Sequence, residues 1–83
     1  MITSPEIWDI LLKKMPREHW VSLQEIYQIV ERYGSLDRED FYPKGPGSST
    51  PKWKRNVSNV LQNRKENGEI RWNGKAQYWL RQR

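Results

Sequence analysis

The sequence predicts a small, mainly helical α+β domain in which three helices precede a C-terminal two-stranded β-hairpin. Three segments with apolar residues at helical spacing end before residue 68, and Asn73-Gly74, a strong hairpin-turn signal, follows them. Charge is distributed unevenly along the chain. From Lys44 onwards there are ten basic and two acidic residues (10 − 2 = +8), whereas residues 1–43 contain five basic and eight acidic residues (5 − 8 = −3). A basic helix that runs into a hairpin is typical of a winged helix-turn-helix.

The composition limits the domain count and the kind of chemistry. The 83 residues have room for one core but not for a core plus a deep active site, so we expect a single domain over 1–83, which could be a module of a larger protein. The absence of cysteine excludes disulfides and thiolate metal sites, and it fits a cytoplasmic location. No apolar run approaches the roughly 20 residues that span a bilayer, and no signal peptide is expected before Ser4.

The first helix has clear start and stop signals. We expect Ser4 as its N-cap, Pro5 at the first helical position and Pro16 beyond its end. The helix carries an apolar row at four-residue spacing, made of Ile7, Leu11 and Met15.

A short extended segment, Trp20-Val21, is predicted to lead into the second helix. Ser22 and Glu25 have the spacing of a capping box, which marks a helix start. Gly34 is expected to end this helix in the left-handed conformation. The predicted buried stripe is Ile26, Ile29, Val30 and Tyr33.

Residues 35–50 form the least regular part of the chain. A short helical turn is expected to end near residue 42, and residues 44–49 have loop composition. This long connection departs from a helix-turn-helix, in which the link before the last helix is normally tight. Asp37, Glu39 and Asp40 are expected to lie in a solvated turn rather than to bind a metal ion.

No catalytic constellation can be assembled from the sequence. His19 is the one histidine, and without cysteine it cannot build a structural zinc site. The Gly-Pro-Gly-Ser-Ser-Thr loop at 45–50 lacks the Gly-Lys-Ser/Thr ending of a phosphate-binding loop. We therefore predict no enzyme, no catalytic residue, no metal site and no cofactor.

The third helix is predicted over residues 51–67, with Thr50 as N-cap, Pro51 at the first position and Gly68 closing it. Outside one apolar stripe, the surface of this helix is rich in basic and amide side chains. An apolar stripe inward and a basic face outward is the pattern of a recognition helix. The apolar stripe is made of Trp53, Val57, Val60 and Leu61.

The outer arc of this helix supplies most of the predicted DNA contacts. Arginine, amide and hydroxyl side chains can bond to base edges, whereas lysines neutralise phosphates. The expected base-reading residues are Arg55, Asn56, Ser58, Asn59 and Gln62. The expected phosphate contacts are Lys52, Lys54 and Lys65. Trp53 could be core or could contact DNA, and both readings stay open.

The wing is predicted over residues 70–80. A two-residue loop would pair Trp72 with Lys75, whereas a three-residue loop would pair Trp72 with Ala76. We expect the three-residue loop, because it places four large side chains on one face of the hairpin. These four are Ile70, Trp72, Tyr78 and Leu80.

Other wing residues are candidates for contact with DNA or a partner. Arg71, Asn73 and Lys75 are expected to enter the minor groove or to touch the backbone. Trp79 is expected to lie exposed on the outer face. Trp72 would be a core residue in the preferred register and a wing-tip contact in the other.

Three short motifs follow one another along residues 51–80: Trp53-x-Arg55-x-Val57-x-x-Val60-Leu61, Gly68-x-Ile70 and Tyr78-x-Leu80. Together with the charge division they resemble the winged-helix domain at the N-terminus of Mrr-type restriction endonucleases. They are also similar to the winged-helix modules attached to HNH and PD-(D/E)XK nucleases that cut modified DNA. The resemblance implies double-stranded DNA as the partner, bound by a targeting or modification-sensing module of a restriction-modification system. It also implies a linked or associated nuclease domain, and some relatives read N6-methyladenine.

Two other functions are kept as alternatives. Winged helices also assemble protein complexes, and the exposed Trp79 with the long connection at 35–50 would suit a protein-interaction module. RNA fits less well, because the major groove of A-form RNA is too narrow for a recognition helix. We expect a monomer that contacts no membrane.

Overall fold

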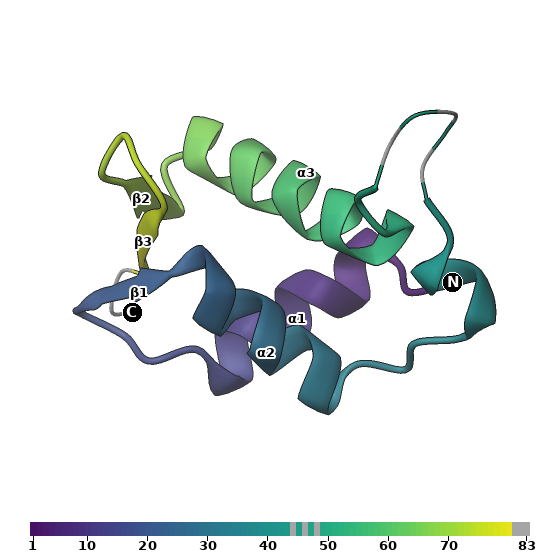
Figure 1. The fold of residues 1–83 in the computed structure, drawn as a ribbon. Coiled ribbons are helices and arrows are strands. Elements are labelled where there is room, and N and C mark those ends of the chain that lie inside the picture. Colours follow the sequence, from purple (N-terminus) through teal and green to yellow (C-terminus); the bar gives the residue numbers. More distant parts are fainter. Residues whose placement is uncertain (44, 46, 48, 81–83) are drawn as a thin grey trace.

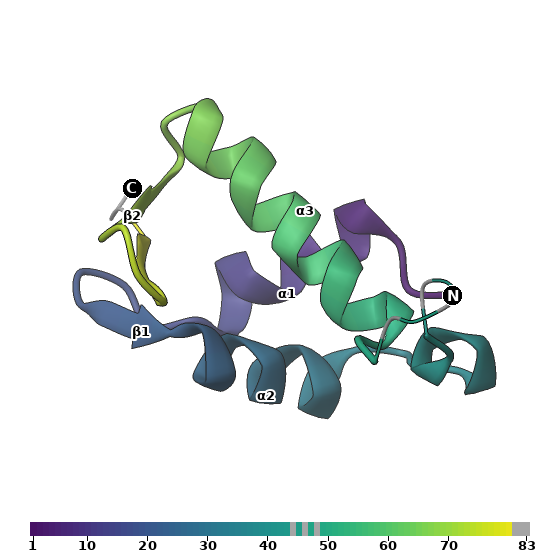
Figure 2. The same ribbon diagram turned by 45° about the horizontal axis from the view of Figure 1, so that its top comes forward.

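The computed structural model describes residues 1–80 except Lys44, Pro46 and Ser48, so the predicted loop at 44–49 lies partly outside the described residues. Three helices pack together and a small sheet lies at one end of them, beside the C-terminal end of α3 (Figure 1). Turning the molecule shows α3 crossing in front of α1, with α2 running below them (Figure 2). This is the predicted winged-helix fold. In order, the elements are α1 (Ser4–Lys14), β1 (Trp20–Ser22), α2 (Leu23–Tyr33), the 3-10 helix η1 (Arg38–Phe41), α3 (Lys52–Glu66), β2 (Ile70–Trp72) and β3 (Gln77–Leu80).

Two of the predicted helix starts are wrong by one residue. Thr3, not Ser4, caps α1, because its Oγ1 accepts a hydrogen bond from the Glu6 N–H at 3.3 Å. Pro51, not Thr50, is the N-cap of α3. Pro51 is extended because it forms a β-bridge with Pro43. A hydrogen bond from the Lys52 N–H to the Tyr42 carbonyl, at 2.9 Å, joins the same two segments.

The second helix begins as predicted but ends differently. The Ser22 hydroxyl accepts from the Glu25 N–H at 3.1 Å. Gly34 has φ −87° and ψ 156°, so the predicted left-handed stop is wrong. Glycine is required there by a close approach instead, since a Cβ atom would lie 2.7 Å from the Ile2 Cδ1 and 2.7 Å from the Val30 carbonyl oxygen. The left-handed glycine after a helix is Gly68, with φ +78°, as predicted for the end of α3.

The core lies between the three helices and the inner face of the sheet. The predicted apolar rows of α1 and α3 are buried, whereas the stripe on α2 is shorter than predicted. Tyr33 is 48% exposed, because Gly34 takes the inward position against Ile2. Lys14 lies over the Tyr33 ring instead, with its Nζ 4.7 Å from the centroid. The buried apolar residues are Ile2, Ile7, Trp8, Ile10, Leu11, Met15, Val21, Ile26, Val30, Trp53, Val57, Val60, Leu61, Ile70 and Leu80.

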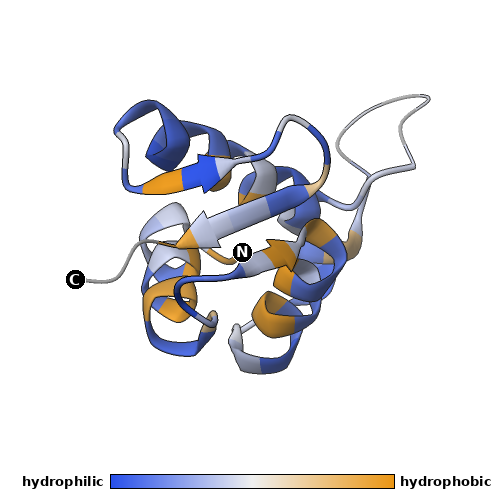
Figure 3. Ribbon diagram, turned by 90° about the vertical axis from the view of Figure 1, so that its left-hand side faces the viewer, coloured by the Kyte–Doolittle hydropathy of each residue, from blue (hydrophilic) through white to orange (hydrophobic). Residues whose placement is uncertain are grey.

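The sheet has three antiparallel strands in the order β1-β3-β2, not the two strands predicted (Figure 3). The additional strand is the segment Trp20–Ser22, whose extended conformation the sequence predicted without its partner. Trp20 pairs with Trp79, and Val21 pairs with Tyr78. The pairing fixes the wing to the helical part of the domain.

The hairpin register differs from the prediction by two residues, although the shared face is confirmed. Trp72 pairs with Tyr78 rather than with Ala76, and Ile70 pairs with Leu80. The reason lies in Asn73, whose N–H donates to the Gln77 carbonyl at 3.2 Å and whose Oδ1 accepts from the Lys75 and Gln77 N–H groups at 2.8 and 3.3 Å. Asn73 is therefore the last paired residue of the strand end, and the loop is centred one residue later than expected.

Candidate nucleic-acid interface

Helix α3 separates an apolar side from a polar side along its whole length. Its buried side packs on the core, and Trp53 is only 2% exposed there. On the opposite side Arg55, Asn59 and Gln62 recur at helical spacing and are all exposed. Five basic residues and one acid give the helix a charge of 5 − 1 = +4. This exposed row and the cations beside it form a single surface, which we call the α3 face.

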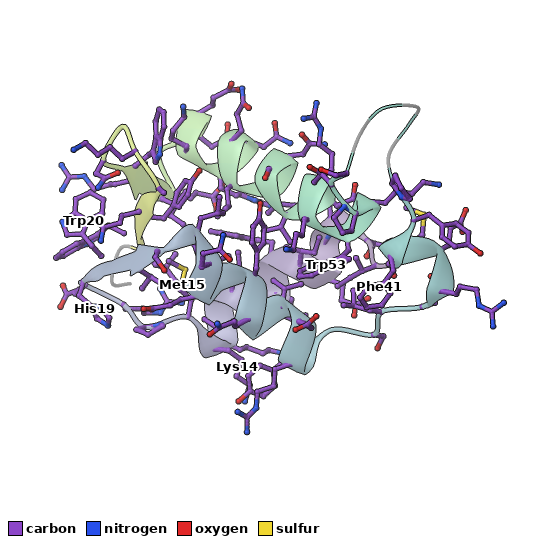
Figure 4. All side chains as sticks on the ribbon, viewed as in Figure 1. Lys14, Met15, His19, Trp20, Phe41 and Trp53 are labelled. Atoms are coloured by element: carbon purple, nitrogen blue, oxygen red, sulfur yellow. The ribbon has the colours of Figure 1, made fainter. Side chains whose placement is uncertain are left out.

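The structure decides the position of Trp53. Its ring lies between α3 and the segments before it, edge-on to Tyr27 at 5.7 Å and to Phe41 at 6.4 Å (Figure 4). A side chain buried to this extent cannot touch DNA, so Trp53 leaves the set of predicted contacts. None of the remaining predicted contacts on α3 is buried. Three are exposed, namely Arg55, Asn59 and Gln62. The other five are half-buried: Lys52, Lys54, Asn56, Ser58 and Lys65.

One residue of α2 belongs beside the α3 face and was missed by the sequence analysis. The Tyr27 hydroxyl lies 3.3 Å from Ser58 Oγ, and Lys54 Nζ lies 5.1 Å from the centre of the Tyr27 ring. The Ser58 hydroxyl is therefore shared with a protein partner, which limits its freedom to bond to a base. No local sequence signal marks Tyr27 as a surface neighbour of α3, because Tyr27 and Ser58 are 31 positions apart in the chain.

The C-terminal end of α3 and the wing meet at Trp72. Lys65 Nζ lies 4.7 Å from the centre of the Trp72 ring, and the indole N–H donates to the Lys75 carbonyl at 2.9 Å. Trp72 is on the same sheet face as the buried Ile70 but is 43% exposed, so it is not the core residue expected from the preferred register. Its strand partner Tyr78 is half-buried, and burial raises the pKa of the Tyr78 phenol.

The other predicted wing contacts have unequal positions. Lys75 is exposed at the tip. Arg71 pairs with Trp79, on the sheet face opposite Trp72, although it lines a surface hollow together with Lys65. The Asn73 amide is engaged within the loop, where its Nδ2 also donates to Gln77 Oε1 at 2.9 Å. Asn73 therefore shapes the wing tip more directly than it could contact a ligand.

The outer sheet face carries an aromatic pair. Trp79 is half-buried rather than exposed, because its ring packs edge-on against Trp20 with centroids 5.5 Å apart. Trp20 is 42% exposed and points away from the helices (Figure 4). This pair lies on the opposite side of the sheet from Trp72 and is separate from the α3 face.

The acidic cluster of Asp37, Glu39 and Asp40 includes one buried residue that binds the N-terminal segment. Asp40 therefore does not lie in the solvated turn that was predicted for it. Both Asp40 carboxylate oxygens accept from the Ile2 N–H at 3.1 Å, and Oδ2 also accepts from the Asp37 N–H at 3.0 Å. Asp40 has no exposed surface, whereas Asp37 and Glu39 are exposed. Within the described residues, no group of three or more histidine, cysteine or acidic side chains is placed to hold a metal ion.

Comparisons with protein-family models, with curated proteins and with solved structures give no match to this chain. The fold therefore defines the class: a winged-helix domain with a three-stranded sheet. Among the described residues, no helix has the length and apolar character to cross a membrane.

Proposed function

We propose that this winged helix binds double-stranded DNA through the α3 face, with α3 in the major groove and the wing on the adjacent backbone or minor groove. One observation carries the proposal: Arg55, Asn59 and Gln62 form an exposed row on a helix of charge +4, with cations on its flanks. An α-helix with side chains is about 10–12 Å across and the major groove is about 12 Å wide, so the two surfaces are matched in size.

The side chains on the α3 face divide by chemistry into two groups. Arg55 has the fork geometry that bonds to guanine, whereas Asn59 and Gln62 have amides that can form two hydrogen bonds with adenine. Each such side chain–base contact contributes about 1–3 kcal/mol of discrimination against the wrong base. Lysines attract phosphates whatever the base sequence, so they would supply affinity without readout. Lys52 lies 3.8 Å from Glu39, an exposed pair weak enough for a phosphate to replace. The proposed phosphate contacts are Lys52, Lys54, Lys65, Arg71 and Lys75.

Selection from a randomised duplex library at about 150 mM ionic strength tests readout, because nonspecific binding weakens steeply in salt. We expect enrichment of one short motif. Asn59→Ala should relax the preference within that motif, whereas Lys65→Gln should weaken binding to all sequences about equally. Lys13→Gln is the matched control, because Lys13 is an exposed lysine of α1. A library without any enrichment would contradict base readout.

The resemblance to nuclease-attached winged helices supports two narrower proposals. The domain would direct a linked or associated nuclease to its target, and it would read N6-methyladenine. The same selection with adenine-methylated and unmodified libraries separates these from plain sequence readout. Equal enrichment from the two libraries would remove the methyl reader and leave the DNA-binding domain.

A protein-interaction module is the second candidate, and the aromatic pair on the outer sheet face favours it. Trp20 and Trp79 with the neighbouring Arg71 are residue types that dominate binding energy in protein interfaces. Under the DNA proposal, Trp20→Ala should leave duplex affinity unchanged. If duplex binding is weak, independent of sequence and lost in salt, the protein-interaction module becomes the better account.

A further inference from the structure

The wing presents a flat aromatic ring that binding to an intact duplex does not require. Trp72 keeps 43% of its surface exposed, although it lies on the sheet face that carries the buried Ile70 and Leu80. Its strand partner is Tyr78. The indole lies outside the core, where the wing approaches Lys65 of α3. The Lys65 ammonium lies 4.7 Å from the ring centre.

The exposed ring is held in one orientation. Its Nε1 donates to the Lys75 carbonyl at 2.9 Å, so the indole is tied to the wing loop. Asn73 fixes that loop through its Oδ1, which accepts from the Lys75 N–H at 2.8 Å, and through its Nδ2, which donates to Gln77 Oε1 at 2.9 Å. Gly74, with φ +84°, supplies the left-handed turn. A large apolar ring that is both exposed and fixed is already arranged for a ligand, because little side-chain entropy remains to be lost on binding.

The surroundings of the ring indicate the chemistry of that ligand. The Lys65 ammonium lies over the indole, and Arg71 shares a surface hollow with Lys65. Lys75 is an exposed residue of the wing loop, and its backbone carbonyl accepts the indole N–H. An aromatic face beside clustered cations binds single-stranded nucleic acid, because each unpaired base can stack on the ring while the cations neutralise its phosphate. Within an intact duplex the base faces are covered by their neighbours, so away from the duplex ends only an unpaired base offers the indole a flat partner.

The geometry points to a duplex with an adjoining unpaired nucleotide as the ligand, in which α3 holds the duplex and Trp72 stacks on the first unpaired base. This inference rests on the proposed duplex binding by the α3 face and specifies its substrate class. The stacking contact is independent of base identity, since every base has a face that can stack. Readout by α3 and stacking by Trp72 therefore make separable contributions to affinity.

Three probes test the inference by equilibrium binding to the full chain. Each is a duplex closed by a hairpin at one end. The open end is blunt, carries a short thymidine overhang, or carries an abasic overhang of the same length. We expect the thymidine overhang to bind about five-fold tighter or more than the other two, as one base–aromatic stack provides. The abasic probe has the added phosphates without the bases.

Two substitutions and a matched control assign the effect to the ring. Trp72→Ala should remove the gain from the thymidine overhang, whereas Trp72→Phe should keep most of it. Trp20→Ala is the control, because Trp20 is equally exposed (42% against 43%) but lies on the outer sheet face, and it should keep the full gain. Circular dichroism of each variant establishes that it is folded.

The outcomes separate this inference from the proposed function. Equal affinity for the three probes would overturn the junction ligand and leave duplex binding in place. An equal gain from the abasic overhang, or an equal loss in Trp20→Ala and Trp72→Ala, would also overturn it. The absence of binding to any probe would instead remove the proposed function itself.

Discussion

Replacement of Asp40 with asparagine should destabilise the domain, although the two side chains have nearly the same shape. Asp40 is fully buried and accepts from the backbone N–H groups of Ile2 and Asp37 at 3.0–3.1 Å. An asparagine would turn a donor group toward one of these two donors. Since a hydrogen bond to a charged acceptor is worth about 1.5–3 kcal/mol, we expect a loss of that size in the free energy of unfolding. In a domain of 60–100 residues this lowers Tm by about 6–24 °C.

Thermal unfolding followed by far-UV circular dichroism at neutral pH measures this loss. Glu39→Gln is the matched control, because Glu39 is the exposed neighbour in η1 and its ion pair with Lys52, at 3.8 Å, lies at the surface. Exposed pairs contribute about 0–1 kcal/mol, so the control should unfold close to the wild type. If Asp40→Asn and Glu39→Gln had the same Tm, the buried carboxylate would not stabilise the chain start as we describe.

Two further predictions concern stability. Gly34→Ala should cost about 1–3 kcal/mol, because its new methyl group would lie 2.7 Å from the fixed Val30 carbonyl oxygen; an unchanged urea midpoint would refute this. Asp37→Asn should reduce stability most between about pH 4 and 8, measured as the difference from wild type in urea titrations. The Met1 ammonium bond lowers the pKa of Asp37 below 3.8, so its stabilisation is lost as pH falls through that lowered value. The same bond raises the pKa of the Met1 amine above 8.0, so this stabilisation is also lost as pH rises through the raised value. If the stability difference between wild type and Asp37→Asn did not change with pH, the Met1–Asp37 ion pair would not stabilise the domain as described.

The features that the sequence predicted correctly depend on residues close together in the chain. The Ser22 cap bonds to a residue three positions away, and Gly68 ends α3 through its own backbone conformation. The buried row of α3 follows from helical spacing alone. The exposed row of the α3 face follows from the same spacing, so the candidate site could be located before its neighbours were known.

Two features that the sequence did not predict, the third strand and the burial of Asp40, depend on contacts between distant residues. Trp20 pairs with Trp79, so the third strand could not be recognised from either segment alone. Asp40 is buried because it binds the backbone of Ile2, 38 residues away. The hairpin register was missed for a local reason, since the Asn73 side chain, rather than the Asn-Gly turn alone, sets the loop position.

The salt dependence of duplex affinity tests the central claim, that the α3 face and the wing bind DNA, most directly. If the five proposed phosphate contacts, Lys52, Lys54, Lys65, Arg71 and Lys75, all neutralise phosphates, the logarithm of affinity should fall against the logarithm of salt concentration with a slope of about −4 to −5. Replacing Lys54 and Lys65 by glutamine should make the slope shallower by about 2. A wild-type slope shallower than about −2, or one unchanged by these two replacements, would contradict the proposed surface.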